Sequence, residues 1–550
     1  MRRENAERTK RCRKSGEVVE VRFRSKLTWL LLPLFGFLGL IWYLIRVIPK
    51  PSRAAYPCMK VAAPLASSFA GYLASLGVVV WAGRQLRMNL RRRRLVLSAT
   101  CLLALVAGLM IHASVQFRDT SAEVAASGSA YTPSDPPNTP MGVAKGINPG
   151  RVVWVRDVKA TTWDGQTGNW WSDADCNQAV VNKMVSTSLQ TLTGATTDRD
   201  AWDKTFRFYN REHGRGDAGY KRGEKIVIKI NSNVDGSGKD WTNTGYPSPQ
   251  AIYAVVSQLI DVAGVPGDNI TVAEPSRYIG DPICSKITGN PIPEYKNVWF
   301  ASKKEVRGTR RIIPAPDANT VVYCDPTSAG KKHTLPKCYT DASYMINLAL
   351  LRPHRVFGVT LCAKNHFGSI YDGKTYTPAA LHNYALWDLS HNKLGDPHCH
   401  PCLIGHKDLG GKTILYMLDG LYTSYNNWPN ASIKKWQTLG DEWCASVLAS
   451  QDPIAIDSVG LDLIRNEPNL TTGNPGFTPN VCNYLHEAAQ ANQPPSGAVY
   501  DPEKTGKKLP SLGVHEHWNN ATDRKYSRNL GRGNGIELVY VGPDSSSPRP

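Results

Sequence analysis

The stretch from Met345 to Gly368 (MINLALLRPHRVFGVTLCAKNHFG) limits the fold more than any other part of the chain. Its first seven residues, Met345–Leu351, are mostly apolar, which is typical of a strand buried on both faces. Pro353 cannot donate to a sheet ladder, so we expect the strand to end there. His354 then lies in a turn, and Val356–Ala363 is expected to be a short apolar helix or loop. A buried strand of this kind predicts an α/β protein.

Strands and helices alternate through the rest of the large C-terminal part. Lys225–Ile230 (KIVIKI) predicts a strand, Pro249–Ala263 has a helical apolar stripe, and Asn269–Ala273 (NITVA) predicts the next strand. Parallel strands need such a crossover helix between them. Further strands are expected at Arg151–Val155, Thr413–Leu418 and Gly535–Val541. The expected fold class is α/β, with a mainly parallel sheet flanked by helices and a division into two lobes left open.

Three uncharged apolar runs lie in the first 117 residues, at Leu27–Ile45, Val61–Ala82 and Leu95–Phe117. Each is close to the roughly 20 residues that a helix needs to cross a bilayer core. They predict three transmembrane helices, so residues 27–117 are expected to be a membrane anchor after a basic N-terminus, residues 1–26.

The positive charge is concentrated in the same part of the chain. The formal net charge is +19, and residues 1–118 hold 21 Lys+Arg against 4 Asp+Glu, whereas the rest is nearly balanced. A balanced C-terminal part argues against nucleic acid as a partner. Residues 1–26 carry ten Lys/Arg and the 84–94 connector six, against three in the 49–60 connector. Positive-inside counting therefore predicts a multi-pass protein of the cell (inner) membrane, with a cytoplasmic N-terminus and the large domain outside.

Composition divides the remainder into three segments. Residues 118–147 are rich in Ser, Ala, Pro and Gly, which predicts a flexible linker. Residues 148–541 are expected to form the extracytoplasmic α/β domain, and residues 542–550 a disordered tail.

Polar side chains recur where the expected strands end. In a parallel sheet the carboxyl ends of the strands share one edge, so these residues are expected to meet in one crevice. Lys364 could bind an anion there, or act as a base if burial lowers its pKa. The expected catalytic residues are Lys364, Asp419 and His354. The expected substrate-binding residues are Lys229, Asn231, Asn233, Glu274, Asn365, His366 and Asp457.

A second group of candidates is the sequence His398-Cys399-His400-Pro401-Cys402, with His382, His391 and His406 nearby. Three interpretations stay open: a disulfide, a divalent metal site of zinc or copper type, and a redox pair. The metal candidates are His398, Cys399, His400, Cys402 and His406. Nine cysteines lie after residue 118, so an oxidising compartment permits up to four disulfides and leaves one cysteine over, which we expect to be Cys362. Short spacing also favours a Cys324–Cys338 disulfide.

Several runs resemble the domain of unknown function 362 family, namely IKINSN, SPQAIYAVVSQLIDVAG, VAEPSR, LLRPHRVFGVTLCAKNHFG, HKDLGGKTILYMLDGLY and SQDPIAIDSVGLDLI. The resemblance covers most of residues 148–541 and implies a membrane-anchored, bacterial-type member. It implies no established activity. Some members resemble iron–sulfur proteins, but this chain lacks the closely spaced four-cysteine run of a bacterial ferredoxin.

Two functions follow as hypotheses. The first is an envelope enzyme acting on a small anionic or carbohydrate-like compound through a Lys/Asp/His crevice. The second is a non-catalytic metal-binding or redox module built on the His/Cys cluster at 382–406. The expected partners are the lipid bilayer and a small-molecule ligand.

Overall fold

A nine-stranded sheet lies at the centre of the C-terminal part of the chain. All of its strands run in the same direction except β15, which is antiparallel to both of its neighbours. The order across the sheet is β17 (Glu537–Val541), β2 (Arg151–Arg156), β15 (Ser446–Ser450), β12 (Thr413–Gly420), β9 (Tyr344–Leu350), β3 (Ile226–Ile230), β4 (Ile270–Glu274), β5 (Trp299–Ser302) and β6 (Arg311–Ile312). The predicted α/β class with a mainly parallel sheet is confirmed.

The structure is a computed structural model that describes residues 84, 85, 87–89, 135–232, 241–324, 332–378, 381, 393–426, 431–474 and 476–542. The chain divides into two units, Met1–Ala125 and Ala126–Pro550. In the described part, no helix has the length and apolar character needed to cross a bilayer. The three expected spans, the basic residues 1–26 and the end of the tail, 543–550, lie outside the described residues.

The sheet has two buried faces because each central strand alternates its side chains between them. Every residue of β9 is buried, as is every residue of β12 beside it. In β3, Val227 faces one core, whereas Ile226 and Ile228 face the other. This burial on both faces is what the apolar run at Met345–Leu351 predicted.

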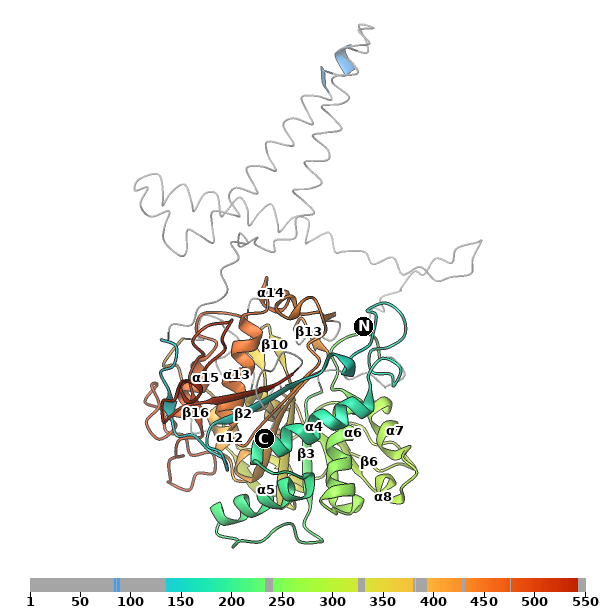
Figure 1. Cartoon of the computed structure of the whole chain (residues 1–550), viewed down its shortest axis with the longest axis vertical. Coiled ribbons are helices and arrows are strands. Elements are labelled where there is room, and N and C mark those ends of the chain that lie inside the picture. The colour runs from blue at the N-terminus through green and yellow to red at the C-terminus, as the bar shows by residue number, and fades with distance from the viewer. Residues whose placement is uncertain are drawn as a thin grey trace, which may run out of the picture. The chain divides into compact units, whose positions relative to one another are not determined.

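Helices cover both faces (Figure 1). On one side lie α4 (Gln178–Thr193), α5 (Asp198–Glu212), α6 (Pro249–Ser257) and α7 (Asp281–Thr288). On the other lie α10 (Cys362–Asn365), α12 (His400–Gly405), α13 (Pro453–Arg465) and α15 (Asn483–Ala489). Of the candidate site residues, this second layer carries Lys364 and Asn365 on α10, His400 and Cys402 on α12, and Asp457 on α13.

Local sequence explains where the longer helices begin and end. The Asn177 side chain accepts hydrogen bonds from two backbone N–H groups at the start of α4, and Gly194 ends the helix in the left-handed conformation. Asp452 caps α13 in the same way, with Pro453 at the first helical position.

The segment after β9 differs from the expected apolar helix or loop. Residues Arg352–His354 (β10) and Gly358–Thr360 (β11) form a two-stranded antiparallel hairpin, and α10 follows it. Pro353 is tolerated within β10 because this strand pairs on one side only. Gly358 has a φ of 79°, and a Cβ there would lie 1.8 Å from Val481 Cγ2, so glycine is required at this turn.

Part of the expected linker is packed on the domain. β1 (Met141–Gly142) pairs with β16 (Val514–His515), and the Asn138 N–H donates to the His517 carbonyl at 2.9 Å. Lys145 N–H donates to Asp452 Oδ2 at 2.8 Å. These contacts contradict a flexible linker for residues 135–147. The domain also clusters as one unit, so two lobes are not found.

The two expected disulfides are absent from the described residues. All nine cysteines there are outside disulfides, including the Cys399–Cys402 and Cys324–Cys338 pairs. Cys399 Sγ instead lies 3.8 Å from His400 Nδ1. The disulfide prediction is therefore wrong for this structure.

Candidate functional site

A buried ion pair between β3 and β4 lies at the carboxyl end of the sheet. Lys229 Nζ lies 2.9 Å from Glu274 Oε2, and the two side chains are 0% and 2% exposed. Glu274 also accepts from Ser276 Oγ at 2.6 Å and from the Ser232 N–H at 3.3 Å. Burial lowers the pKa of Lys229 below its usual range, although Glu274 opposes the shift. Two of the expected strand-end residues are therefore paired with each other.

Asn365 of α10 joins this ion pair to the next strand. Its Oδ1 accepts from Lys229 Nζ at 2.9 Å, and its Nδ2 donates to Asn347 Oδ1 at 2.8 Å. Asn347 Nδ2 lies 3.1 Å from His366 Nε2. Burial lowers the pKa of His366 to about 3, so this imidazole is neutral near pH 7. Four of the predicted residues, Lys229, Glu274, Asn365 and His366, therefore meet in one polar network.

Lys364 lies beside this network, between two aromatic rings. Its ammonium is 3.9 Å from the centroid of Phe367 and 4.5 Å from that of Phe357, both in the range of cation–π contacts. Burial lowers the pKa of Lys364 to about 7; Cys399 opposes this shift, and Arg352 and Arg277 add to it. Burial beside two aromatic rings, with two arginines nearby, thus favours the neutral amine of Lys364.

Arg352, at the start of β10, is a buried cation within electrostatic reach of Lys364. It is 2% exposed, and its guanidinium donates to Asn231 Oδ1 at 3.0 Å and to the Gly245 carbonyl at 3.3 Å. Among the described residues, Nε has no hydrogen-bond partner and no carboxylate pairs with the group. Burial lowers the pKa of Arg352 to about 9. The residue that was expected to bind substrate, Asn231, thus holds this arginine.

Asp457 of α13 fixes the start of α10. Its carboxylate accepts from the backbone N–H groups of Cys362 at 2.8 Å and Ala363 at 3.0 Å, and from Tyr484 Oη at 3.2 Å. Burial raises the pKa of Asp457 to about 7, against the effect of these hydrogen bonds. Asp457 therefore positions the helix that carries Lys364 and Asn365.

Asp419 lies on the opposite face of the sheet, away from α10. Alternation along β12 places Leu418 in the core beneath α10 and α13, so Asp419 points to the layer that contains α6. There it accepts from the Ser248 N–H at 2.7 Å and the Leu421 N–H at 3.2 Å. Burial raises the pKa of Asp419 to about 6. The expected Lys364–Asp419 pair is not formed.

The remaining predicted residue of the catalytic set, His354, stabilises the β10–β11 turn. Its Nδ1 accepts hydrogen bonds from the backbone N–H groups of Val356 at 3.1 Å and Phe357 at 3.2 Å. The lone pair of that nitrogen is therefore engaged by the turn. Asn233 lies outside the described residues, as do His382 and His391.

The predicted metal candidates only partly converge. One ligand atom each of His398, Cys399 and His400 lies within 4.8 Å of the others. The two imidazoles approach to 2.5 Å between their Nδ1 atoms, which is shorter than the separation of about 3.3 Å between two nitrogen ligands of tetrahedral zinc. His406 Nε2 lies 2.9 Å from the Val321 carbonyl, and Cys402 lies within α12.

Sequence reasoning missed two sets of residues. Arg352 stands in the run LLRPHR, where a cation directly after a mostly apolar strand was the available signal. Cys482 and His486 are spaced for one helix face, and His515 and His517 for one strand face. Those two spacings were the signal for a second cluster, in which Cys482, His515 and His517 lie together with Asp135.

Comparison with known proteins places this site within a family. Residues 226–462 match the family model described as "Domain of unknown function (DUF362)". No curated protein matches the sequence. The matched part runs from β3 to α13 and contains Lys229, Glu274, Arg352, Lys364 and Asp457. The resemblance seen in the sequence is therefore confirmed over residues 226–462, and this part of the chain belongs to the domain of unknown function 362 family.

Proposed function

We propose that this protein is an enzyme acting on a small anionic compound at the carboxyl edge of its sheet. Arg352 and Lys364 bind the anion, and Lys364 exchanges a proton with it. The observation that carries this proposal is the buried Arg352 guanidinium, whose Nε has no partner among the residues described.

Burying the Arg352 guanidinium is energetically costly. Removing a charged group from water costs several kcal/mol unless a partner compensates it, as Glu274 does for Lys229. Among the described residues, the Arg352 guanidinium donates to two neutral oxygens, and its positive charge also lowers the pKa of Lys364. An oxyanion or carboxylate would supply the missing negative charge and match the planar guanidinium in geometry.

Lys364 supports a catalytic role as well as binding. With a pKa of about 7, its side chain is present both as an ammonium and as a neutral amine near pH 7. Such a group can act as a general acid or base at neutral pH. Phe357 and Phe367 hold the amine in place by contact with their ring faces.

The test is a thermal-shift panel of small anions (phosphate, sulfate, carboxylates and sugar phosphates) on the purified full-length chain. At least one anion is expected to stabilise the parent, and Arg352→Met and Lys364→Met should each weaken its binding by about ten- to a hundredfold. Lys412→Met is the matched control, because Lys412 is equally buried but bonds to the carbonyls of Tyr339 and Ala342. Equal anion binding by Arg352→Met and the parent would contradict the proposal.

A second function rests on the proximity of His398, Cys399 and His400. In this alternative the protein is a non-catalytic metal-binding or redox module. Stoichiometric metal that is lost on changing Cys399 and Cys402 to serine would favour it, whereas anion-dependent stabilisation that survives those changes favours the enzyme.

We also propose that the domain is held outside the cell membrane by the three apolar runs of its N-terminal part. The support is the asymmetry of Lys and Arg between the connectors. A phosphatase reporter fused after Val115 is expected to be active and one fused near Arg91 inactive; the reverse result would overturn this orientation.

A further inference from the structure

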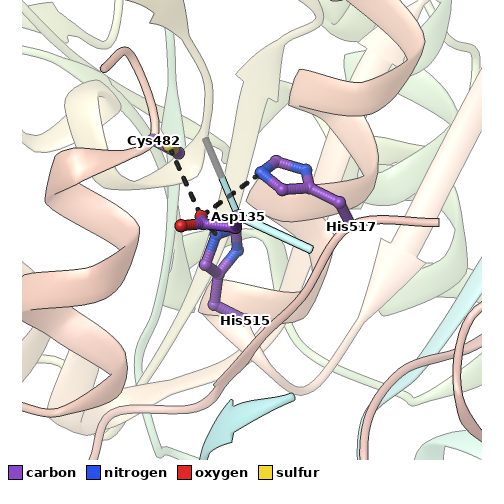
Figure 2. A group of neighbouring side chains, drawn as sticks. All are labelled: Asp135, Cys482, His515 and His517. Carbon is purple, nitrogen blue, oxygen red and sulfur yellow. Dashed lines mark hydrogen bonds and ion pairs between the residues drawn. The ribbon is translucent and has the colours of Figure 1, made fainter. Parts of the chain in front are cut away.

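A second polar cluster lies outside the part of the chain that matches the family model. It consists of Asp135, Cys482, His515 and His517, whose side chains point toward one another (Figure 2). One ligand atom of each residue lies within 4.8 Å of the other three. The set contains a thiol, two imidazoles and a carboxylate, which are the groups that bind zinc in proteins.

Three separate segments contribute to this cluster, which we call the Cys482 cluster. Cys482 is the residue before α15, and His515 and His517 lie in and just after β16. Asp135 belongs to the segment that enters the domain and then pairs with β16 through β1. The cluster therefore joins the entering segment to two distant parts of the chain.

Both imidazoles of the cluster are buried. His515 is 0% exposed and His517 1%. Within the described ranges, Nε2 of each has no hydrogen-bond partner. Burying a polar atom without a hydrogen-bond partner is unfavourable, so two such atoms in one place point to a ligand-binding site.

The other nitrogen of each ring fixes the tautomer. His517 Nδ1 lies 2.6 Å from Asp462 Oδ1, a carboxylate that can only accept. His515 Nδ1 lies 2.8 Å from Ser458 Oγ, which donates its own hydrogen to the Ile454 carbonyl at 2.6 Å. Both Nδ1 atoms are therefore the donors, and both Nε2 atoms present lone pairs to the cluster. A carboxylate behind a ligand histidine is the usual arrangement at zinc sites.

The distances fit a tetrahedral ion. Asp135 Oδ2 lies 3.8 Å from Nε2 of His515, 3.8 Å from Nε2 of His517 and 3.9 Å from Cys482 Sγ. Zinc bonds of about 2.0–2.3 Å place tetrahedral ligands about 3.3–3.8 Å apart. Small side-chain movements would bring all four atoms to bonding distance.

We propose that Asp135, Cys482, His515 and His517 bind one zinc ion that clamps the entering segment onto the domain. Four protein ligands leave no open position, so the site is structural. His486 Nε2, at 2.6 Å from Asp135 Oδ2, orients the carboxylate.

The test is the metal content of the full-length chain, purified without a metal-affinity step and supplied with zinc, copper and iron. We expect about one zinc per chain. Zinc should be lost from a His515→Ala/His517→Ala double variant, and Asp462→Asn should weaken zinc binding by about ten- to a hundredfold. The matched control is His398→Ala/His400→Ala, which alters the other histidine pair and should retain the zinc.

A second readout covers the case in which a variant does not fold. Cobalt exchanged into the parent should give the charge-transfer absorption of a metal–thiolate bond, and Cys482→Ser should abolish it. Zinc absent from the parent, copper or iron in its place, or zinc lost only from the His398/His400 variant would each overturn the proposal.

Discussion

The buried Lys229–Glu274 pair gives the sharpest prediction about the polar network. Glu274→Gln keeps the shape of the side chain but removes the charge that balances Lys229. All three donors of the Lys229 ammonium are used, at 2.7 Å to the Ile230 carbonyl and 2.9 Å each to Glu274 and Asn365. The variant therefore leaves a fully buried cation without an ionic partner.

The magnitude follows from the burial of the pair. Breaking a buried ion pair by removing one partner costs about 3–5 kcal/mol. Unfolding entropy of about 2.1 cal/mol/K per residue gives about 0.85 kcal/mol/K for a domain of roughly 400 residues, so Tm should fall by about 4–6 °C. Differential scanning calorimetry of the full-length chain measures this shift.

Two controls separate charge burial from a general effect of amide substitution. Asp217→Asn removes one side of the exposed Arg211–Asp217 pair, where the side chains are 51% and 60% exposed, and should shift Tm by less than about 1 °C. Lys229→Met/Glu274→Gln removes the unbalanced charge and should recover part of the loss. A Glu274→Gln Tm within 1 °C of the parent would refute the reasoning.

Three further predictions concern α10 and its neighbours. In the Asp457→Asn variant, one side-chain oxygen must serve the two N–H groups at the start of α10 that two carboxylate oxygens serve in the parent. The free energy of unfolding, measured by urea denaturation, should therefore fall by about 1–3 kcal/mol. Anion affinity of the parent should fall about tenfold between pH 6 and pH 8 as Lys364 loses its proton, whereas Lys364→Met should bind equally at both, measured by calorimetric titration. Gly368→Ala places a Cβ 2.1 Å from Glu274 Oε1, so its Tm should fall, and an unchanged Tm would contradict the close packing.

Much of the sheet was predictable because its central strands are short apolar runs bounded by polar residues. The meeting of Lys229 and Glu274 followed from the rule that parallel strands share a carboxyl edge, whereas Asn365 reaches the pair from α10. Asp419 was wrongly placed because β12 continues to Gly420, and alternation then turns Asp419 to the other face. A shift of one residue along a strand reverses the face of a side chain, and strand ends are the least certain positions in a sequence.

The Arg352 position and the Cys482 cluster depend on contacts that the local pattern does not encode. Arg352 is buried because β10 and β11 form a hairpin, which the apolar sequence after Pro353 did not indicate. Asp135 meets Cys482 across 347 residues of sequence, and it lies in a segment whose composition predicted a flexible linker.

The central claim is that an anion binds between Arg352 and Lys364. Crystals of the protein soaked with selenate test it directly, because selenium scatters anomalously and selenate has the charge and shape of a small oxyanion. We expect an anomalous peak within hydrogen-bond distance of both Arg352 Nε and Lys364 Nζ, which disappears in Arg352→Met. Selenate found only elsewhere, with Arg352 Nε bonded to another group of the protein, would contradict it.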